Sequence, residues 1–287
     1  MRVLVTGATG FIASHLIPSL ACAGHDVIAA GHDPARIRPG AEALSFDLAD
    51  SDWPALPDVD AIVHLAQANV PFPDGADALF AVNVAATQRL LEHLRRCGGR
   101  HFVFASSGSV YGTSDAPLTE ASPLAARDFY AATKVAAERL TQAYDQHFGT
   151  TILRLFVPYG PGQVRRMLPR LADRIRSGEP IQLNREGRPR MNPIYVDDVS
   201  RVVAGALARD DGAGVLNVAG DDVTDIRAVS ELIGEIIGVE PKFEEGEGRA
   251  ADIVADNATL HAFLGDAELV PLREGLERMV RIPMRVI

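Results

Sequence analysis

Cysteine, tryptophan and positive charge are scarce in this chain of 287 residues. It has two cysteines and one tryptophan, and 28 lysines and arginines stand against 38 aspartates and glutamates. Cys22 and Cys97 lack metal-ligand spacing, so we predict no metal site and expect buried free thiols on helices. The net charge of −10 argues against a nucleic-acid partner, which needs a basic surface.

Long apolar runs are also missing. No stretch approaches the roughly 18 apolar residues of a membrane span, so no membrane partner is expected. The apolar run after Arg2 breaks at Thr6-Gly7, which does not resemble a signal peptide. Hydrophobic residues still make up 47% of the chain, enough for a sizeable core. The composition therefore predicts a soluble, cytoplasmic protein with one large domain or one domain plus a smaller lobe.

Short apolar runs alternate with helical patterns through the first half, which is typical of a parallel sheet covered on both faces. The expected strands are Val3–Val5, Asp26–Ala30, Ala43–Phe46, Ala61–Leu65, His101–Ala105 and Thr151–Leu155. The expected helices are Ile12–Ala23, Ala76–Cys97 and Phe129–Phe148. We predict an α/β fold whose residues 1–157 form a Rossmann-type doubly wound parallel sheet.

The pattern changes after residue 157, where a loop rich in proline and glycine begins. The expected strands beyond it are Ile181–Leu183, Asn192–Tyr195 and Val215–Val218, and the expected helices are Val164–Ser177, Val196–Ala208, Ile226–Ile237 and Pro271–Val280. We predict that residues 158–287 form a smaller C-terminal α/β lobe that binds the substrate. As an alternative, residues 196–218 could pack onto the main sheet of the first domain.

A glycine-containing turn joins the first expected strand to the first expected helix. Gly7 and Gly10 are expected to take positive φ and to let the backbone approach a ligand closely. The amides that open the helix then point at an anion, which the helix dipole favours. A strand, a glycine turn and a helix in this order predict a dinucleotide site, and an ordinary βα turn is the alternative.

Ligands of open α/β sheets bind outside the carboxyl ends of the strands. This rule predicts cofactor contacts from Gly7, Thr9, Gly10, Phe11, Ile12, His32, Arg36, Asp47, Leu48, Leu65, Ala66, Gln67 and Ala105. The end of the second strand would hold an acidic residue in an NAD-selective site. Here Gly31 and His32 occupy it, and Asp33 lies just beyond. Arg36 and Arg38 could meet a 2′-phosphate, so the sequence leans slightly to NADP over NAD, although solvated loop charges explain both arginines equally well.

Tyr130 and Lys134 stand four residues apart on an expected helix, where such positions share one face. A neighbouring ammonium stabilises phenolate, so it moves the pKa of a tyrosine toward the range useful for acid–base catalysis. Ser107 follows the fifth expected strand, where its hydroxyl could share a substrate oxygen with Tyr130. We predict Ser107, Tyr130 and Lys134 as catalytic; the alternative is an ordinary surface pair on the helix.

At these residues the chain resembles the extended short-chain dehydrogenase/reductase family, in its NAD(P)-dependent nucleotide-sugar epimerase/dehydratase branch. The resemblance covers nearly the whole chain. It rests on Thr6–Ala13, His64–Ala66, Asn83-Val84, Ser106–Gly112, Tyr130 with Lys134, Arg154–Gly162 and Tyr195–Val199. It implies a Tyr130 that exchanges a proton with a sugar hydroxyl or ketone, a Lys134 that holds the nicotinamide ribose, and a Ser107 that orients the reacting oxygen.

The resemblance implies further contacts and a quaternary structure. Added cofactor contacts are Asn83, Tyr130, Lys134, Phe156 and Pro158. Substrate contacts are Ser107, Ser109, Tyr130, Val157, Arg190 and Arg249. The two long expected helices of the first half would pair with their mates in a homodimer.

Departures from the family pattern bear on the reaction. Dehydratases of this branch place an acidic pair where this chain has Gly108 and Ser109, which argues against a dehydratase. Members that hold a nucleotide diphosphate often carry asparagine at Val157 and arginine near Met191, although Arg190 is adjacent. The first hypothesis is an epimerase or oxidoreductase acting at C4 of a nucleotide sugar. The alternatives are a ketoreductase or dehydrogenase of a small non-nucleotide substrate and a non-catalytic dinucleotide-sensing protein.

Overall fold

The computed structural model describes residues 1–37, 40–184, 188–246 and 252–281. The chain forms two compact units. The first comprises residues 1–112, 123–154 and 199–216, and the second comprises residues 113–122, 155–198 and 217–287. A boundary at residue 157 would leave 113–122 in the first domain, whereas their contacts group them with the second unit. That residues 1–157 bind the cofactor and residues 158–287 bind the substrate stays a prediction.

A seven-stranded sheet forms the centre of the first unit. Its strands are β1 (Arg2–Thr6), β2 (Asp26–Gly31), β3 (Glu42–Ser45), β4 (Ala61–His64), β5 (His101–Ser107), β6 (Gly149–Leu155) and β10 (Gly212–Val218). Their order is β10-β6-β5-β4-β1-β2-β3, and the pairs from β5 to β3 are parallel. The sheet is the predicted Rossmann-type α/β fold, and β10, which contains the expected strand Val215–Val218, joins it as an edge strand.

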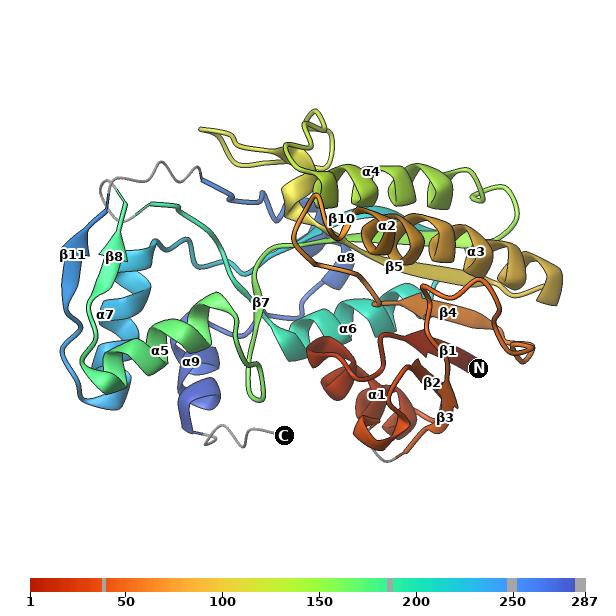
Figure 1. The fold of residues 1–287 in the computed structure, drawn as a ribbon, viewed down its shortest axis with the longest axis horizontal. Helices are drawn as coiled ribbons and strands as arrows, with labels where there is room; N and C mark the ends of the chain where they lie inside the picture. Colours follow the sequence, from red (N-terminus) through yellow and green to blue (C-terminus); the bar gives the residue numbers. More distant parts are fainter. Residues whose placement is uncertain (38–39, 185–187, 247–251, 282–287) are drawn as a thin grey trace. The chain divides into compact units, whose positions relative to one another are not determined.

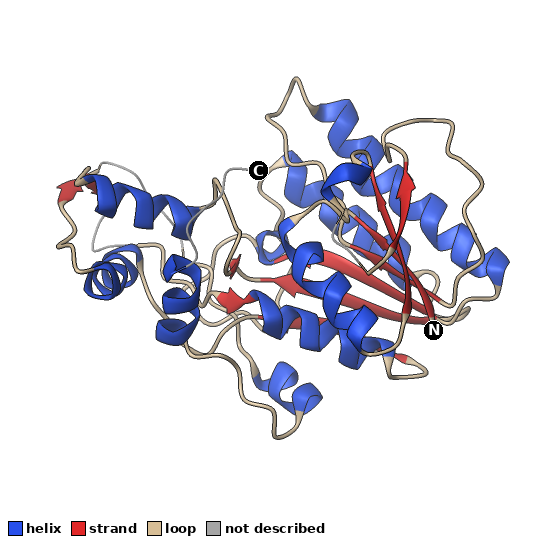
Figure 2. Ribbon diagram, turned by 90° about the horizontal axis from the view of Figure 1, so that it is seen from below, coloured by secondary structure: helices blue, strands red, loops and turns tan. Residues whose placement is uncertain are grey.

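Helices cover both faces of this sheet (Figures 1 and 2). They are α1 (Phe11–Cys22), α2 (Ala76–Phe80), a π-helical turn (Ala81–Ala85), α3 (Ala86–Cys97), α4 (Phe129–Gln142) and α6 (Val196–Leu207). Figure 1 shows α2, α3 and α4 on one face and α1 and α6 on the other. Two 3₁₀ turns complete the unit, η1 (Pro34–Arg36) and η3 (Gly108–Tyr111).

The central strands are buried on both faces, which is why they are almost continuously apolar. Leu4, Ile62 and Phe102 pack with Leu90 and Leu94 of α3 in one hydrophobic cluster. Burying a side chain of this size contributes about 1.5–3 kcal/mol. This packing fixes the strand ends and therefore the loops that leave them.

Several helix boundaries differ from the sequence prediction. The expected helix Phe129–Phe148 ends at Gln142, and the rings of Tyr144 and Phe148 then stack 5.7 Å apart in a non-helical turn. The expected helix Val164–Ser177 begins at Met167, because Arg165 takes φ +58°. The expectation of buried thiols is wrong for Cys22, which is exposed at the end of α1; Cys97 is half-buried.

The second unit combines short strands with helices. Its elements are β7 (Pro158–Tyr159), β8 (Ile181–Leu183), β9 (Ile194–Tyr195), β11 (Phe243–Glu245), α5 (Met167–Ser177), α7 (Ile226–Ile237), α8 (Ala258–Leu264) and α9 (Leu272–Arg281). A hydrophobic cluster that includes Leu171, Ile233 and Leu276 joins α5, α7 and α9. Three of these elements, β7, β11 and α8, are short and were not predicted from the sequence. No helix in the described ranges is long and apolar enough to cross a bilayer.

Candidate active site

The turn after β1 meets the end of β4. Gly7 has φ +70°, and a Cβ built on it would lie 2.7 Å from the amide nitrogen of Ala66 and 3.0 Å from the carbonyl carbon of Leu65. Neighbouring β1 and β4 are where the strand order reverses, and ligands of doubly wound sheets bind at this reversal. The expectation of positive φ at Gly10 is wrong: φ is −82°, the extended backbone usual for a residue that precedes a helix.

The start of α1 fits a phosphate group. No side chain among the described residues caps the helix, and its first turn contains no acidic residue. The first amides of a helix have no intrahelical acceptor, and the dipole adds partial positive charge there. Phe11 and Ile12 open the helix, and Thr9 lies beside Gly31, where an added Cβ would be 3.2 Å from Thr9 Cγ2. The turn therefore suits the pyrophosphate of a dinucleotide.

The ends of β2 and β3 are more open. The predicted contact residues there are His32, Arg36, Asp47 and Leu48, of which the first three are exposed and Leu48 packs against the core. Asp33 Oδ1 accepts a hydrogen bond of 3.2 Å from the amide of Ala35. Arg38 lies outside the described residues. Nothing in this arrangement commits the site to a 2′-phosphate.

A buried histidine ties the ends of β1 and β4 to α3. His64 Nδ1 lies 2.7 Å from Thr6 Oγ1, and Nε2 lies 3.1 Å from Thr87 Oγ1. The Thr87 hydroxyl donates to the carbonyl of Asn83, so we infer that His64 donates from Nε2 and accepts at Nδ1. Burial, with a smaller effect of the Lys134 charge, lowers the pKa of His64 to about 3. His64 therefore stays neutral near pH 7 and holds the strand ends in place.

Asn83 occupies the π-helical turn, a feature that is frequent at functional sites. Its side chain exchanges hydrogen bonds of 2.8 and 3.1 Å with the backbone of Ala68 and donates to Thr133 Oγ1 at 3.0 Å. The Thr133 hydroxyl donates in turn to the carbonyl of Tyr130. Asn83 thus couples the loop after β4 to α4, and its predicted cofactor contact stays a prediction.

Helix α4 carries the predicted acid–base pair. Lys134 is 1% exposed and donates from Nζ to the carbonyl of Ala105 at 2.7 Å. Its Nζ lies 6.0 Å from the centre of the Tyr130 ring. The half-buried Tyr130 donates its hydroxyl to Gln67 Oε1 at 2.7 Å. Burial lowers the pKa of Lys134 to about 7, against the opposing effect of the Glu138 carboxylate.

Ser107 ends β5 and caps the following 3₁₀ turn. Its Oγ accepts hydrogen bonds from the amide of Ser109 at 3.2 Å and from the hydroxyl of Ser109 at 3.0 Å. Within the described part of the chain these contacts leave the hydroxyl proton of Ser107 available as a donor. The structure therefore holds the Ser107 oxygen in a defined place on the first unit, which also carries Tyr130 and Lys134.

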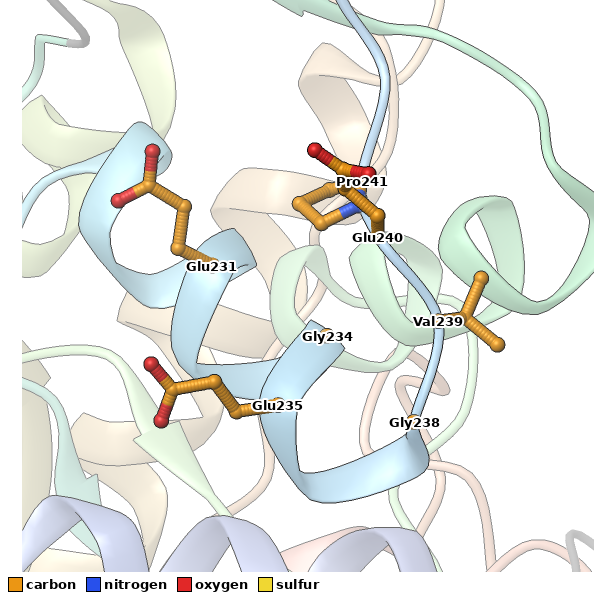
Figure 3. Close-up of a pocket in the computed structure, with 7 residues that line it drawn as sticks. All are labelled: Glu231, Gly234, Glu235, Gly238, Val239, Glu240 and Pro241. Carbon is orange, nitrogen blue, oxygen red and sulfur yellow. The ribbon is translucent and has the colours of Figure 1, made fainter.

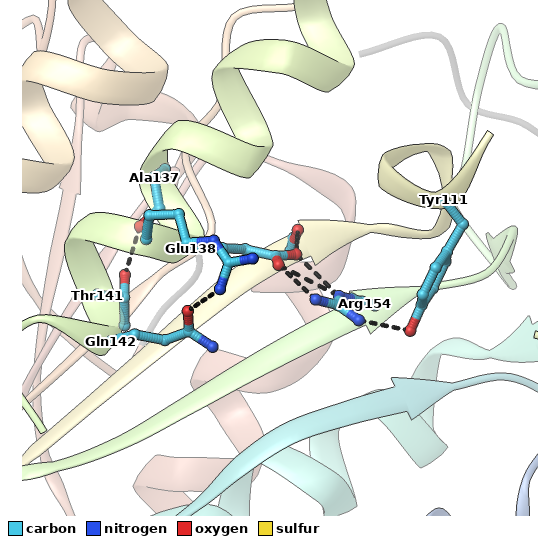
Figure 4. A network of polar contacts seen from close by, with 8 residues as sticks. Tyr111, Ala137, Glu138, Thr141, Gln142 and Arg154 are labelled. Atoms are coloured by element: carbon cyan, nitrogen blue, oxygen red, sulfur yellow. Dashed lines mark hydrogen bonds and ion pairs between the residues drawn. The ribbon is translucent and has the colours of Figure 1, made fainter. Parts of the chain in front are cut away.

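Four polar residues behind this site were not singled out by the sequence analysis as a group: Ser106, Tyr111, Glu138 and Arg154. They form a buried network around an ion pair between Glu138 and Arg154, and Figure 4 shows this pair together with Tyr111. Their spacing along the chain gives no local signal, because the pair joins a helix to a strand. Ser106, Tyr111 and Arg154 fall within the motifs that carry the family resemblance, and Glu138 stands four residues beyond Lys134, hence on the same helical face, but neither observation indicates that the four residues meet.

The remaining predicted residues lie in the second unit. Phe156 is buried, and its amide donates to the carbonyl of Val218. Val157 takes φ +47°, which is rare for a β-branched residue, and Pro158 opens β7. Arg190 is ion-paired with Asp252 at 2.8 Å and is not simply a solvated charge. Arg249 lies outside the described residues.

A surface hollow of about 450 Å³ is found in the second unit (Figure 3). It is lined by the end of α7 and the loop after it, with Glu231, Glu235 and Glu240 at its edge. None of the predicted site residues lines it. Its lining offers no hydroxyl, phenol or ammonium group for acid–base chemistry, so we do not place the reaction there.

Comparison with known proteins bears on this site. The model of the "NAD dependent epimerase/dehydratase family" matches residues 3–219. The chain is 31% identical over 265 residues to YtcB of Bacillus subtilis, described as an uncharacterized UDP-glucose epimerase, with 83% of each chain covered. It is 30% identical to the GDP-6-deoxy-D-mannose reductase of Pseudomonas aeruginosa, over 97% of this chain and 96% of that protein.

Solved structures show the same similarity in three dimensions. MoeE5 in complex with UDP-glucuronic acid and NAD matches with a TM-score of 0.86 and 31% identity, over 98% of both chains. The similarity therefore extends well beyond the glycine turn and includes both units.

Proposed function

Because the chain belongs to the NAD-dependent epimerase/dehydratase family of extended short-chain dehydrogenase/reductase enzymes, we propose that it is an epimerase acting at C4 of a nucleotide sugar. In such a reaction the C4 hydroxyl is oxidised to a ketone, which is then reduced from the opposite face. Membership of an enzyme family rejects the hypothesis of a non-catalytic dinucleotide-sensing protein.

The observation that carries this proposal is the environment of Lys134. An ordinary surface pair on a helix would leave the lysine in solvent, whereas Lys134 is 1% exposed and anchored to the end of β5. Burial of an unneeded ammonium costs stability. A cation held next to Tyr130 in this way supports a role in stabilising phenolate.

The proposed roles follow from the positions of three side chains. Tyr130 removes the proton from the C4 hydroxyl and returns it when the new alcohol forms. Lys134 lowers the pKa of the Tyr130 phenol by its charge. Ser107 donates its hydroxyl proton to the reacting oxygen and keeps that oxygen in reach of Tyr130. In the structure the Tyr130 hydroxyl donates a hydrogen bond to Gln67. On substrate binding, the reacting oxygen of the sugar would replace Gln67 as the partner of this hydroxyl.

We propose NAD as the cofactor, which accepts and returns the hydride when bound. The Gly7 turn and the uncapped start of α1 fit its pyrophosphate. The expectation of NADP finds no support, because the similar MoeE5 structure contains NAD and Arg36 is an exposed residue of a 3₁₀ turn. Asp33, just after β2, is the acidic side chain available for a ribose hydroxyl.

We propose a UDP-sugar as substrate, since UDP-glucuronic acid is bound in MoeE5 and YtcB is described as a UDP-glucose epimerase. The second unit supplies Val157, Arg190 and Arg249 as proposed contacts. Arg188 and Arg190 both bind Asp252, which is 3% exposed, so one buried carboxylate orients two guanidinium groups. Oriented arginines suit a diphosphate.

A reductase of a keto sugar is the second candidate, favoured by the similarity to the Pseudomonas aeruginosa reductase. It would perform only the reductive half of the reaction and would consume reduced cofactor. The apolar side chains of Val157 and Met191 favour a small non-nucleotide substrate for such a reductase.

One experiment separates these proposals. Purified protein is incubated with UDP-glucose or UDP-glucuronic acid and with NAD or NADP, and products are followed by NMR while reduced cofactor is followed by absorbance. We expect the two C4 epimers to interconvert with NAD and without net cofactor reduction. In a parallel incubation of a UDP-4-keto sugar with NADH or NADPH, stoichiometric consumption of the reduced cofactor would establish the reductase instead, and activity confined to NADP would overturn the cofactor proposal.

Two variants test the acid–base assignment in the same assay. Tyr130→Phe should lower turnover by about 10²–10⁴, the usual contribution of general acid–base catalysis, with nearly unchanged NAD affinity. Tyr144→Phe is the matched control, because this tyrosine lies beyond α4 and its hydroxyl only approaches Glu92 at 3.4 Å. Full activity of Tyr130→Phe would contradict the proposed chemistry.

We also propose a homodimer through the predicted long helices. Phe72 and Phe80 are 60% and 56% exposed, and Phe72 stacks on Phe129 at the start of α4. Large exposed apolar side chains close to these helices support an interface there. A monomer mass in sedimentation experiments would contradict it.

A further inference from the structure

Helix α4 holds the end of β5 at two successive residues. Tyr130, Lys134 and Glu138 follow one another at four-residue intervals, so they share one face of the helix. Lys134 donates to the carbonyl of Ala105, and Glu138 Oε1 accepts the hydroxyl of Ser106 at 2.5 Å. Ser107 is the next residue. The helix that carries two of the proposed catalytic groups therefore fixes the strand end that delivers the third.

The carboxylate that makes this contact is itself fixed by a buried arginine. Arg154 of β6 donates to both oxygens of Glu138, with Nη2 to Oε2 at 2.7 Å and Nε to Oε1 at 3.1 Å. The side chains are 4% and 1% exposed. A buried ion pair is weak evidence of stabilisation, because removing two charges from water costs about what their attraction returns. The pair's rigid geometry is more relevant to function, since two hydrogen bonds between a guanidinium and a carboxylate fix their relative orientation.

The same arginine reaches the far end of the turn that follows Ser107. Arg154 Nη1 donates to the hydroxyl of Tyr111 at 2.6 Å, and its guanidinium lies 4.7 Å from the centre of that ring. Tyr111 is the last residue of the 3₁₀ turn Gly108–Tyr111. Ser106 before the turn and Tyr111 at its end are thus both bonded to the ion pair, and Figure 4 shows the bond between Arg154 and Tyr111.

We propose that the buried Glu138–Arg154 pair is a positioning element of the reaction, which through Ser106 and Tyr111 fixes Ser107 relative to Tyr130 and Lys134. This inference rests on the proposed function of those three residues. Neither Glu138 nor Arg154 needs to touch the substrate. The pair instead sets the distance and direction of the Ser107 hydroxyl relative to Tyr130 and Lys134. The rate of a reaction between groups held in place is sensitive to such geometry.

The pair has a second effect, on charge. The titratable groups that the structure connects with Lys134 are Tyr130 and Glu138 on α4 and His64 on β4, and Arg154 on β6 is paired with Glu138. His64 is neutral at pH 7, so Glu138 is the negative group that favours protonated Lys134. Without that carboxylate, both burial and the unpaired Arg154 would lower the pKa of Lys134.

The positioning effect is tested by removing the hydroxyl of Ser106. Ser106→Ala keeps the ion pair and every proposed catalytic group. We expect kcat to fall about tenfold or more, with the KM for the UDP-sugar and the Kd for NAD changed less than about twofold. Thr141→Val is the matched control, because Thr141 is a buried residue of α4 whose hydroxyl donates only to the carbonyl of Ala137. Tyr111→Phe should act like Ser106→Ala, since it loosens the other end of the turn.

The charge effect is tested with Glu138→Gln in the NAD-loaded enzyme. The alkaline limb of the kcat–pH profile should move to lower pH by about half a unit or more, because Lys134 then loses its proton earlier. Ser106→Ala should leave this limb in place, since it changes no charge. A structural role alone would lower the midpoint of thermal unfolding without moving the limb.

Each outcome decides one proposal. Wild-type kcat in both Ser106→Ala and Tyr111→Phe would overturn the positioning role, as would an equal loss in Thr141→Val. If Glu138→Gln does not fold, Ser106→Ala and Tyr111→Phe still test the positioning role. Full activity of Tyr130→Phe would refute the proposed chemistry itself, whereas an inactive Tyr130→Phe beside an unaffected Ser106→Ala would refute only the inference drawn here.

Discussion

At the scale of single residues, Gly7 is constrained by the protein's own backbone, whether or not it contacts the proposed cofactor. We predict that Gly7→Ala is destabilised and loses NAD affinity, because the methyl group would lie 2.7 Å from the amide of Ala66. Gly98→Ala is the matched control: Gly98 has a similar φ of +67°, and nothing lies within 4 Å of its Cβ position. Left-handed strain alone costs roughly 1–2 kcal/mol.

Denaturant unfolding and NAD titration of both variants measure the difference. Gly98→Ala should show only the cost of left-handed strain and retain NAD affinity. Gly7→Ala should lose more unfolding free energy than Gly98→Ala, and also NAD affinity, because the end of β4 must move to make room for the methyl group. Equal losses in the two variants would mean that the contact with Ala66 has no effect beyond φ.

At the scale of elements, α4 and α7 begin in the same way, but only α4 carries proposed catalytic residues. Asp128 caps α4 by accepting from the amide of Ala131 at 2.7 Å, and Asp225 caps α7 by accepting from the amide of Ala228 at 2.8 Å. We predict that Asp128→Ala and Asp225→Ala each lower stability by about 1 kcal/mol. Only Asp128→Ala should also lower kcat, because its helix carries Tyr130 and Lys134. Thermal unfolding and the UDP-sugar assay measure the two effects, and an equal kcat loss in Asp225→Ala would contradict this assignment.

Local patterns predicted most of these elements, and what they missed depends on contacts between distant residues. Apolar periodicity located α7 and the central strands. The same periodicity extended α4 to Phe148, although the chain leaves the helix after Gln142 and packs the ring of Phe148 differently. The contact of Gly7 with Ala66 and the pairing of Glu138 with Arg154 join residues far apart in sequence. Such pairs become visible only once β1 lies beside β4 and α4 lies over the sheet.

At the scale of the whole molecule, two buried bases make stability depend on pH. Burial lowers the pKa of His64 from 6.5 to about 3 and that of Lys134 from 10.5 to about 7. Between the folded and unfolded pKa values the unfolded chain binds more protons than the folded one. Stability must therefore rise with pH in that interval. The interval lies between about pH 3 and 6.5 for His64 and between about pH 7 and 10.5 for Lys134.

Lys134→Met tests the upper interval and links stability to activity. Methionine fills the same apolar stem without a titrating group, so the rise in unfolding free energy above pH 7 should be smaller in the variant than in the wild type. Each pKa unit corresponds to about 1.4 kcal/mol, so the shift of Lys134 is large enough to measure by urea unfolding at several pH values. The variant should be inactive and, at neutral pH, at least as stable as the wild type, because it no longer buries a charge. Unchanged slopes above pH 7 would show that Lys134 keeps an ordinary pKa in the folded protein. The cation beside Tyr130 would then carry no cost in stability, and its burial would no longer support a catalytic role for Lys134.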